Sequence, residues 1–134
     1  MASPEITLQG TIKAAVAALT YITANSVPVR NWDDSDDARA LPCVLVRVLP
    51  RERIAPNAPY YKMPVEISCL RHRGDDPNGT GQDSIYAEIS TWANGSGIAT
   101  TLSADGVVQM PGNDELIDSI QFRTVMFDVY DTIA

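Results

Sequence analysis

The sequence predicts an α+β fold in which an antiparallel or mixed β-sheet, built around a long β-hairpin, carries two α-helices on one face. Two strand-like runs, LPCVLVRVLP and KMPVEISCLRHR, flank a polar segment at residues 50–61 that is longer than a tight turn requires. Helical patterns precede and follow this pair, and a last strand-like run, IDSIQFRTVMFDVYD, lies near the end of the chain. Residues 1–134 are expected to form a single domain.

The composition is that of an ordinary globular domain, with 45% hydrophobic and 20% charged residues. The start, MASPEITLQG, has no basic region followed by an apolar stretch, so no signal peptide is expected. No run approaches the roughly 20 apolar residues that span a bilayer. The net charge of −7 disfavours binding to a phosphate backbone or to an anionic membrane surface. DNA could still pass nearby without sticking, because like charges repel.

Residues 4–25 are predicted to form the first helix. Ser3 suits the N-cap, Pro4 suits the first helical position, and Glu5 complements the positive end of the helix. An apolar stripe at helical spacing is expected to cover the sheet. Its members are Leu8, Ile12, Ala15, Leu19 and Ile22. A membrane-surface helix is the alternative, but Lys13 is the only base well inside the segment.

A short extended piece at residues 27–29 and an acidic loop follow the helix. The acidic residues of the loop are Asp33, Asp34, Asp36 and Asp37. They resemble a calcium-binding loop, but the glycine turn and the bidentate acid of an EF-hand are missing at the required offsets. A solvated loop is therefore predicted. Trp32 is expected to be exposed, where it pins the loop or marks a contact surface.

The first strand of the hairpin, predicted over residues 41–49, is apolar on both faces. Alternate residues of a strand point to opposite faces. One face carries Val44, Val46 and Val48, and the other carries Cys43, Leu45, Arg47 and Leu49. Because Arg47 is the one polar residue of the run, both faces are expected to be covered. One cover is a helix, and the other is a second helix or a neighbouring subunit.

The second strand, predicted over residues 62–71, alternates as a half-buried antiparallel strand does, and Pro64 indicates an edge or a strand start. Cys43 and Cys69 lie one in each strand and are predicted to be buried thiols. A disulfide between the neighbouring strands is an alternative that a reducing cytoplasm disfavours. The two cysteines and His72, the only histidine, make a poor zinc set, and His72 is expected at the surface.

The segment between the two strands is predicted to be a protruding tip. A loop of this length inside a domain is usually functional or mobile. It carries arginine, tyrosine and an isolated isoleucine, which are residue types common in interfaces. The candidate interface residues of the tip are Arg51, Arg53, Ile54, Tyr60 and Tyr61. The alternatives are a floppy exposed loop and a nucleic-acid contact through the two arginines, which the surrounding negative charge opposes.

The second helix is predicted over about residues 82–94. Thr80 and Asp83 have the spacing of a capping box, and Asn94 and Gly95 are expected to provide a left-handed stop. The apolar stripe of this helix consists of Ile85, Ile89, Trp92 and Ala93. Residues 96–115 are rich in turn signals, although GVVQM at residues 106–110 can form a short strand.

The last strand is predicted over residues 117–131, and its second face is partly apolar. A monomer that exposed this face together with the matching face of the first hairpin strand would show a larger apolar patch than soluble monomers usually tolerate. A homo-oligomer is therefore predicted. The candidate interface residues of the sheet face are Leu45, Arg47, Leu49, Phe122 and Met126.

The sequence assigns no catalytic, cofactor-binding or metal-binding residue. Carboxylates are plentiful, but their spacing pairs no two of them and supplies no positioned base. A small hydrolase acting through Asp and Glu is therefore the weakest hypothesis. A cytosolic adaptor or inhibitor that binds one protein partner as a monomer or dimer is a further alternative.

The order and patterning of these elements resemble the small tail-terminator (tail-completion) and head–tail joining proteins of long-tailed bacteriophages. The matching features span most of the chain. They are the capped N-terminal helix, the LPCVLVRVLP strand after an irregular loop, the long hairpin, the MPVEISCLR strand, the QDSIYAEISTW helix and the closing strand.

This resemblance implies a structural virion protein that forms a homo-oligomeric ring, commonly of six subunits. Such a ring caps the tail tube and joins it to the capsid connector, so the tail tube protein and the head connector proteins are the implied partners. Genomic DNA would pass through the lumen without specific binding, and no cofactor or membrane is implied. The implied location is the tail at the head–tail junction of the virion, and the host cytoplasm during assembly.

Overall fold

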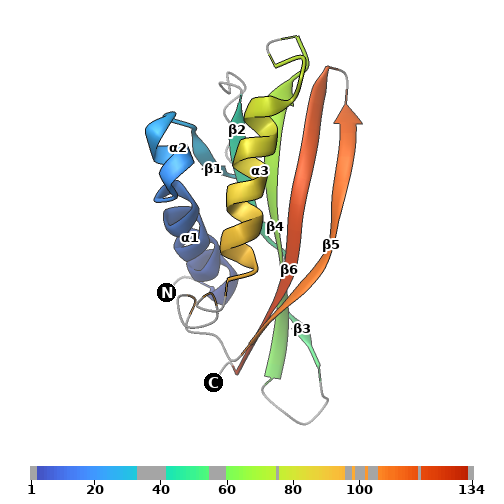
Figure 1. The fold of residues 1–134 in the computed structure, drawn as a ribbon. Helices are drawn as coiled ribbons and strands as arrows, with labels where there is room; N and C mark the ends of the chain where they lie inside the picture. Colours follow the sequence, from blue (N-terminus) through green and yellow to red (C-terminus); the bar gives the residue numbers. More distant parts are fainter. Residues whose placement is uncertain are drawn as a thin grey trace.

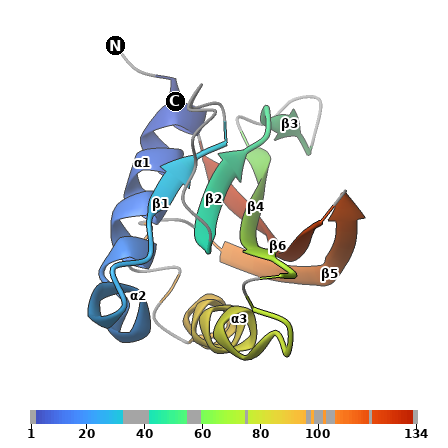
Figure 2. The same ribbon diagram turned by 90° about the horizontal axis from the view of Figure 1, so that it is seen from above.

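The structure is a computed structural model with a six-stranded mixed sheet and three helices packed on one of its faces (Figures 1 and 2). The described residues are 3–32, 42–54, 60–74, 76–95, 98, 102, 106–117 and 119–132. The helices are α1 (Pro4–Ala17), α2 (Thr20–Ala24) and α3 (Thr80–Ala93). The strands are β1 (Val29–Asn31), β2 (Cys43–Val48), β3 (Glu52–Arg53), β4 (Tyr60–His72), β5 (Gly106–Ile117) and β6 (Ile120–Thr132). The predicted α+β class is confirmed.

The strand order is β1-β2-β4-β6-β5, and β3 pairs with β4 beyond the end of β2. β1 runs parallel to β2, whereas the other pairs are antiparallel. The long central strands β4 and β6 are paired over thirteen positions each, from Tyr60 opposite Thr132 to His72 opposite Ile120. The sheet is therefore organised around β4, which belongs to the predicted hairpin, and β6.

The predicted single helix over residues 4–25 is wrong, because the chain breaks at Leu19 into α1 and α2. Leu19 is extended, with φ −64° and ψ 145°. The freed backbone N–H of Tyr21 donates to both carboxylate oxygens of Glu88 on α3, at 2.9 and 3.0 Å. The break thus replaces a backbone hydrogen bond within the helix by hydrogen bonds between α2 and α3. Ile22 on α2 is still buried in the core. The Ser3 N-cap is confirmed, since its side chain accepts from the Ile6 N–H.

The central hairpin is confirmed, but its predicted loop is too long. β3 continues the ladder, with Glu52 opposite Lys62 and Arg53 opposite Tyr61, and the Ile54 N–H donates to the Tyr60 carbonyl at 3.1 Å. The second strand therefore begins at Tyr60 instead of residue 62. The rest of the predicted loop and the acidic loop of Asp33, Asp34, Asp36 and Asp37 lie outside the described residues.

The C-terminal prediction misses most of β5, which continues through residues 111–117 where turn signals suggested a loop. Pro111 and Gly112 coincide with a shift of register between Met110 and Asn113. A bulge on an edge strand tolerates both residue types. An outward-facing position there needs no backbone N–H, which proline lacks, and glycine often marks a bulge. The last strand consequently starts at Ile120 instead of residue 117.

Both predicted ends of the second helix are right to within two residues, but their chemistry differs from the prediction. The N-cap is Gly79, with φ +70°, and no side chain caps it. Asp76 instead accepts from the Gln82 N–H at 3.2 Å. At the other end Asn94 has a φ of −93°, so the left-handed stop is wrong, and the Asn94 side chain donates to the Ser90 carbonyl at 2.8 Å.

The main core lies between the helices and one face of the sheet. It joins apolar residues of all three helices to alternate residues of the central strands. Its largest fully buried members include Ile12, Ile22, Ile67, Ile85, Ile89 and Phe127. The opposite face, called the outer face below, carries a smaller cluster of Cys43, Leu45 and Leu70. The two cysteines are buried thiols, as predicted, and the register places their side chains on opposite faces of the sheet.

Candidate interaction surfaces

The hairpin end is organised around the ring of Tyr61. The guanidinium carbons of Arg51 and Arg53 lie 5.6 and 5.5 Å from the ring centroid. Arg53 also donates to the Tyr61 hydroxyl at 3.0 Å. Guanidinium groups are attracted to the negative face of an aromatic ring, so Tyr61 holds both arginines at the surface.

Arg51 also ties the hairpin to the start of α1. Its backbone N–H donates to Glu5 Oε2 at 3.1 Å, and its Nη1 lies 3.2 Å from Glu5 Oε1. Glu5 therefore does more than complement the helix end, which was its predicted role. The pair is partly exposed, so its contribution to stability is small. The Arg51–Glu5 pair instead fixes the position of the hairpin end relative to α1.

The remaining predicted tip residues line or flank a surface depression of about 410 Å³. Its lining residues are Glu52, Arg53, Ile54, Lys62 and Tyr130. Lys62 lies 3.3 Å from Glu52, and this carboxylate is the main cause of the raised pKa of Lys62. Tyr60 stacks against Tyr130, with ring centroids 6.4 Å apart. The structure thus brings all five predicted tip residues close to one another or to this depression, with Ile54 exposed at its rim.

The predicted sheet-face residues share the outer face, but they differ in exposure. Leu45 is 1% exposed within the single chain, because it packs with Cys43 and Leu70 and with the half-buried Ile120 and Phe122. The expectation that a monomer exposes Leu45 is therefore wrong. Leu49, Phe122 and Met126 are half-buried.

Arg47 contributes a polar stripe to the same face. It lies 3.6 Å from Glu66, the residue opposite it on β4, and its guanidinium covers the ring of Trp32 at 5.3 Å. Trp32 is exposed, as predicted. Next to this stripe, the hydroxyl groups of Ser68 and Thr124 form a buried 2.9 Å hydrogen bond.

Sequence reasoning missed the most exposed apolar residues of the sheet, which lie on β5. Val108, Met110, Leu116 and Ile117 are between 45% and 52% exposed. The register places Met110 beside Met126, and Ile117 beside Ile120, so the apolar part of the outer face continues onto this edge strand. The turn-like Pro-Gly pair hid residues 111–117 of the strand. GVVQM at residues 106–110 was predicted as a short strand, but its apolar residues were not assigned to the outer face.

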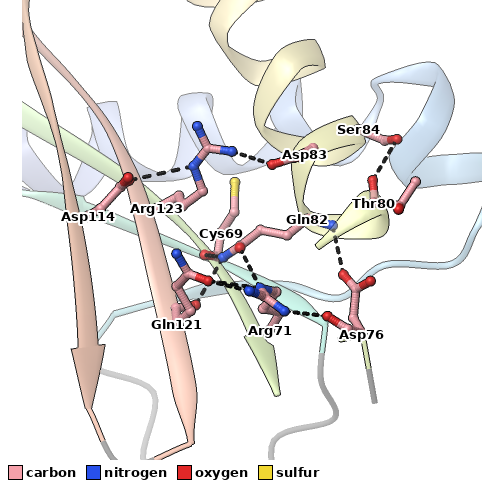
Figure 3. A network of polar contacts seen from close by, with 10 residues as sticks. All are labelled: Cys69, Arg71, Asp76, Thr80, Gln82, Asp83, Ser84, Asp114, Gln121 and Arg123. Carbon is pink, nitrogen blue, oxygen red and sulfur yellow. Dashed lines mark hydrogen bonds and ion pairs between the residues drawn. The ribbon is translucent and has the colours of Figure 1, made fainter. Parts of the chain in front are cut away.

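A polar network joins α3 to the sheet and is built for stability (Figure 3). Gln82 is buried, and its side chain bonds Arg71, the Cys69 carbonyl and the Gln121 carbonyl. Nearby, Arg123 pairs with Asp83 and lies 3.5 Å from Asp114, and its guanidinium covers the Tyr86 ring at 4.2 Å. Most of the polar groups of the network are paired within it, although Arg123 Nε is buried and has no hydrogen-bond partner among the described residues.

Neither the models of known protein families nor the curated proteins contain a match to the chain. Among the residues that the structure describes, no three His, Cys, Asp or Glu side chains gather as metal ligands. No helix in the described part of the chain is long and apolar enough to cross a membrane.

Proposed function

We propose that this chain is a structural protein of the phage virion that forms a homo-oligomeric ring and caps the tail tube, joins the tail to the head, or does both. The observation that supports this proposal most is that the described helices cover only one face of the sheet. All three described helices lie on one face (Figure 2), while the outer face keeps half-buried Leu49, Phe122 and Met126 next to exposed Met110 and Ile117. A patch of this kind favours burial against another subunit.

The proposed mechanism is geometric. Burial of the outer face between neighbouring subunits would close the ring, since contacts between unlike surfaces generate rings when the rotation closes. The hairpin end, with its ordered arginines and exposed Ile54, would contact the tube or the next subunit. The acidic protein would then let DNA pass through the lumen, because repulsion opposes adhesion.

Negative-stain electron microscopy and light scattering of the purified chain test this proposal. Rings with an open hole are expected, and Met110→Asp should reduce them because it places a charge in the proposed contact. Ile6→Asp is the matched control, since Ile6 is 63% exposed on α1 and lies on the other side of the sheet. A wild-type chain that stays monomeric throughout the micromolar range would overturn the ring and favour the adaptor hypothesis.

A further inference from the structure

The two edges of the sheet are treated differently by the rest of the chain. Beyond β1, the exposed side of the β2–β3 segment is capped by side chains of α1. The Val48 N–H donates to Gln9 Oε1 at 3.1 Å, and the Arg51 N–H donates to Glu5 Oε2 at 3.1 Å. These side chains occupy backbone donors that an added strand would need, which is one way in which proteins protect a sheet edge.

The opposite edge, β5, is paired on one side only. It bonds β6 along its length, and no strand in the described part of the chain pairs with its other side (Figure 1). Every residue from Val108 to Ile117 is exposed. An edge of this kind presents a row of backbone N–H and C=O groups to a further strand. The bulge at Pro111 and Gly112 divides it into two segments, residues 106–110 and 113–117.

The charges on β5 indicate what kind of strand fits. The strand carries Asp114 and Glu115 but no lysine or arginine. Asp114 lies beside Arg123, whereas Glu115 is exposed and has no partner among the described residues. A second β5 would bring the same two carboxylates and no base, so charge complementarity favours a different strand. The neighbouring Met110 and Ile117 favour apolar residues at alternate positions of that strand.

We infer that the free edge of β5 accepts an extended segment of another protein, apolar at alternate positions and carrying lysine or arginine, as an added strand of the sheet. This inference goes beyond the proposed function, because strand addition at β5 does not depend on ring closure. Backbone hydrogen bonds between β5 and the added strand would supply affinity. The contacts of Glu115 and of the apolar side chains would supply selectivity.

The test uses two synthetic peptides of about six residues, the length of a typical strand. Both alternate valine with threonine except that one central valine is replaced, by lysine in one peptide and by glutamate in the other, because Glu115 and Ile117 share one face of β5. Binding to the full chain is measured by fluorescence anisotropy, and the contact is located by hydrogen–deuterium exchange. The lysine peptide is expected to bind saturably and to slow exchange within residues 106–117. Glu115→Lys should weaken the lysine peptide about tenfold and strengthen the glutamate peptide.

Glu52→Lys is the matched control, because it makes the same charge change on exposed β3 and should leave both affinities within about twofold. Protection outside β5, equal binding of both peptides, or an equal effect of the two variants would overturn the inference. Concentration-dependent protection of β5 without peptide, if it persists in Met110→Asp, would also overturn it, because the protection would then come from a second copy paired with the edge and not from the outer-face contact. Electron microscopy of the peptide-free chain reports ring formation separately, so failure of one proposal is distinguishable from failure of the other.

Discussion

The side-chain amide of Gln82 on α3 donates a 2.8 Å hydrogen bond to the backbone carbonyl of Cys69 on β4. The same amide group donates to the Gln121 carbonyl on β6 at 3.0 Å, and its oxygen accepts from Arg71 Nε at 3.0 Å. Gln82 is 1% exposed, so these bonds form away from water. One buried side chain therefore fixes the start of α3 over the two central strands.

Gln82→Leu is expected to lower the free energy of unfolding by about 2–4 kcal/mol, because it leaves buried donors and acceptors without partners. Urea denaturation measures the loss. Gln9→Leu is the control, since Gln9 is half-buried and makes one hydrogen bond, to the Val48 N–H. Its cost should stay near 1 kcal/mol. Equal losses for the two variants would contradict the structural role of the buried network.

Gly112→Ala is expected to destabilise the chain and to loosen β5. A Cβ at this position would lie 2.8 Å from the Thr124 carbonyl oxygen and 3.1 Å from the Tyr86 hydroxyl. Backbone cannot easily move away, so we expect a loss of about 1–3 kcal/mol. Gly10→Ala is the control, because nothing lies within 4 Å of its Cβ in the middle of α1. Alanine should stabilise that helix by about 0.5–1 kcal/mol. Thermal unfolding of both variants decides the matter, and a neutral Gly112→Ala would refute the close approach.

The sequence predicted elements well where local pattern and tertiary packing agree. The apolar stripes of Leu8, Ile12 and Ile85, Ile89 mark helix faces that the core indeed buries. The misses have tertiary causes. The break at Leu19 depends on Glu88, a residue far along the chain, and β5 depends on pairing with β6 that outweighs the turn preference of Pro111. No local pattern reports such partners.

The candidate surfaces were predicted less well than the fold. Alternation placed Leu45 on the outer face correctly, but alternation does not show that Leu70 and Cys43 bury it within the same chain. The Arg51–Tyr61–Arg53 arrangement could not be foreseen, because the register of β3 on β4 creates it. Exposure depends on neighbours from several strands, whereas sequence periodicity reports only the direction of each side chain.

The stability of the chain is expected to fall in alkali because of Cys69. Burial raises the pKa of this thiol from its ordinary value of 9.0 to about 12, an effect that Arg123 partly opposes. Above pH 9.0 the unfolded chain loses the thiol proton first, so stability that is present below this pH is lost as the pH rises toward about 12. The loss attributable to this group is at most about 4 kcal/mol. Denaturation of Cys69→Ala across this range should show a shallower decline than the wild type, and parallel curves would contradict the assignment.

The hairpin end should act in assembly without supporting the fold, and Ile54→Asp separates the two roles. Ile54 is 46% exposed at the rim of the depression beside Arg53, so a carboxylate there costs little folding energy. The unfolding midpoint should change by no more than an ordinary surface substitution, about 0.5 kcal/mol in free energy. Ile6→Asp, on α1, again serves as the exposed control. Rings counted by electron microscopy, or tails completed in an assembly extract, should drop about tenfold for Ile54→Asp alone, because a buried unpaired charge weakens a contact. If both variants assemble like the wild type, the hairpin end is no contact surface, and the outer face alone would have to hold the ring together.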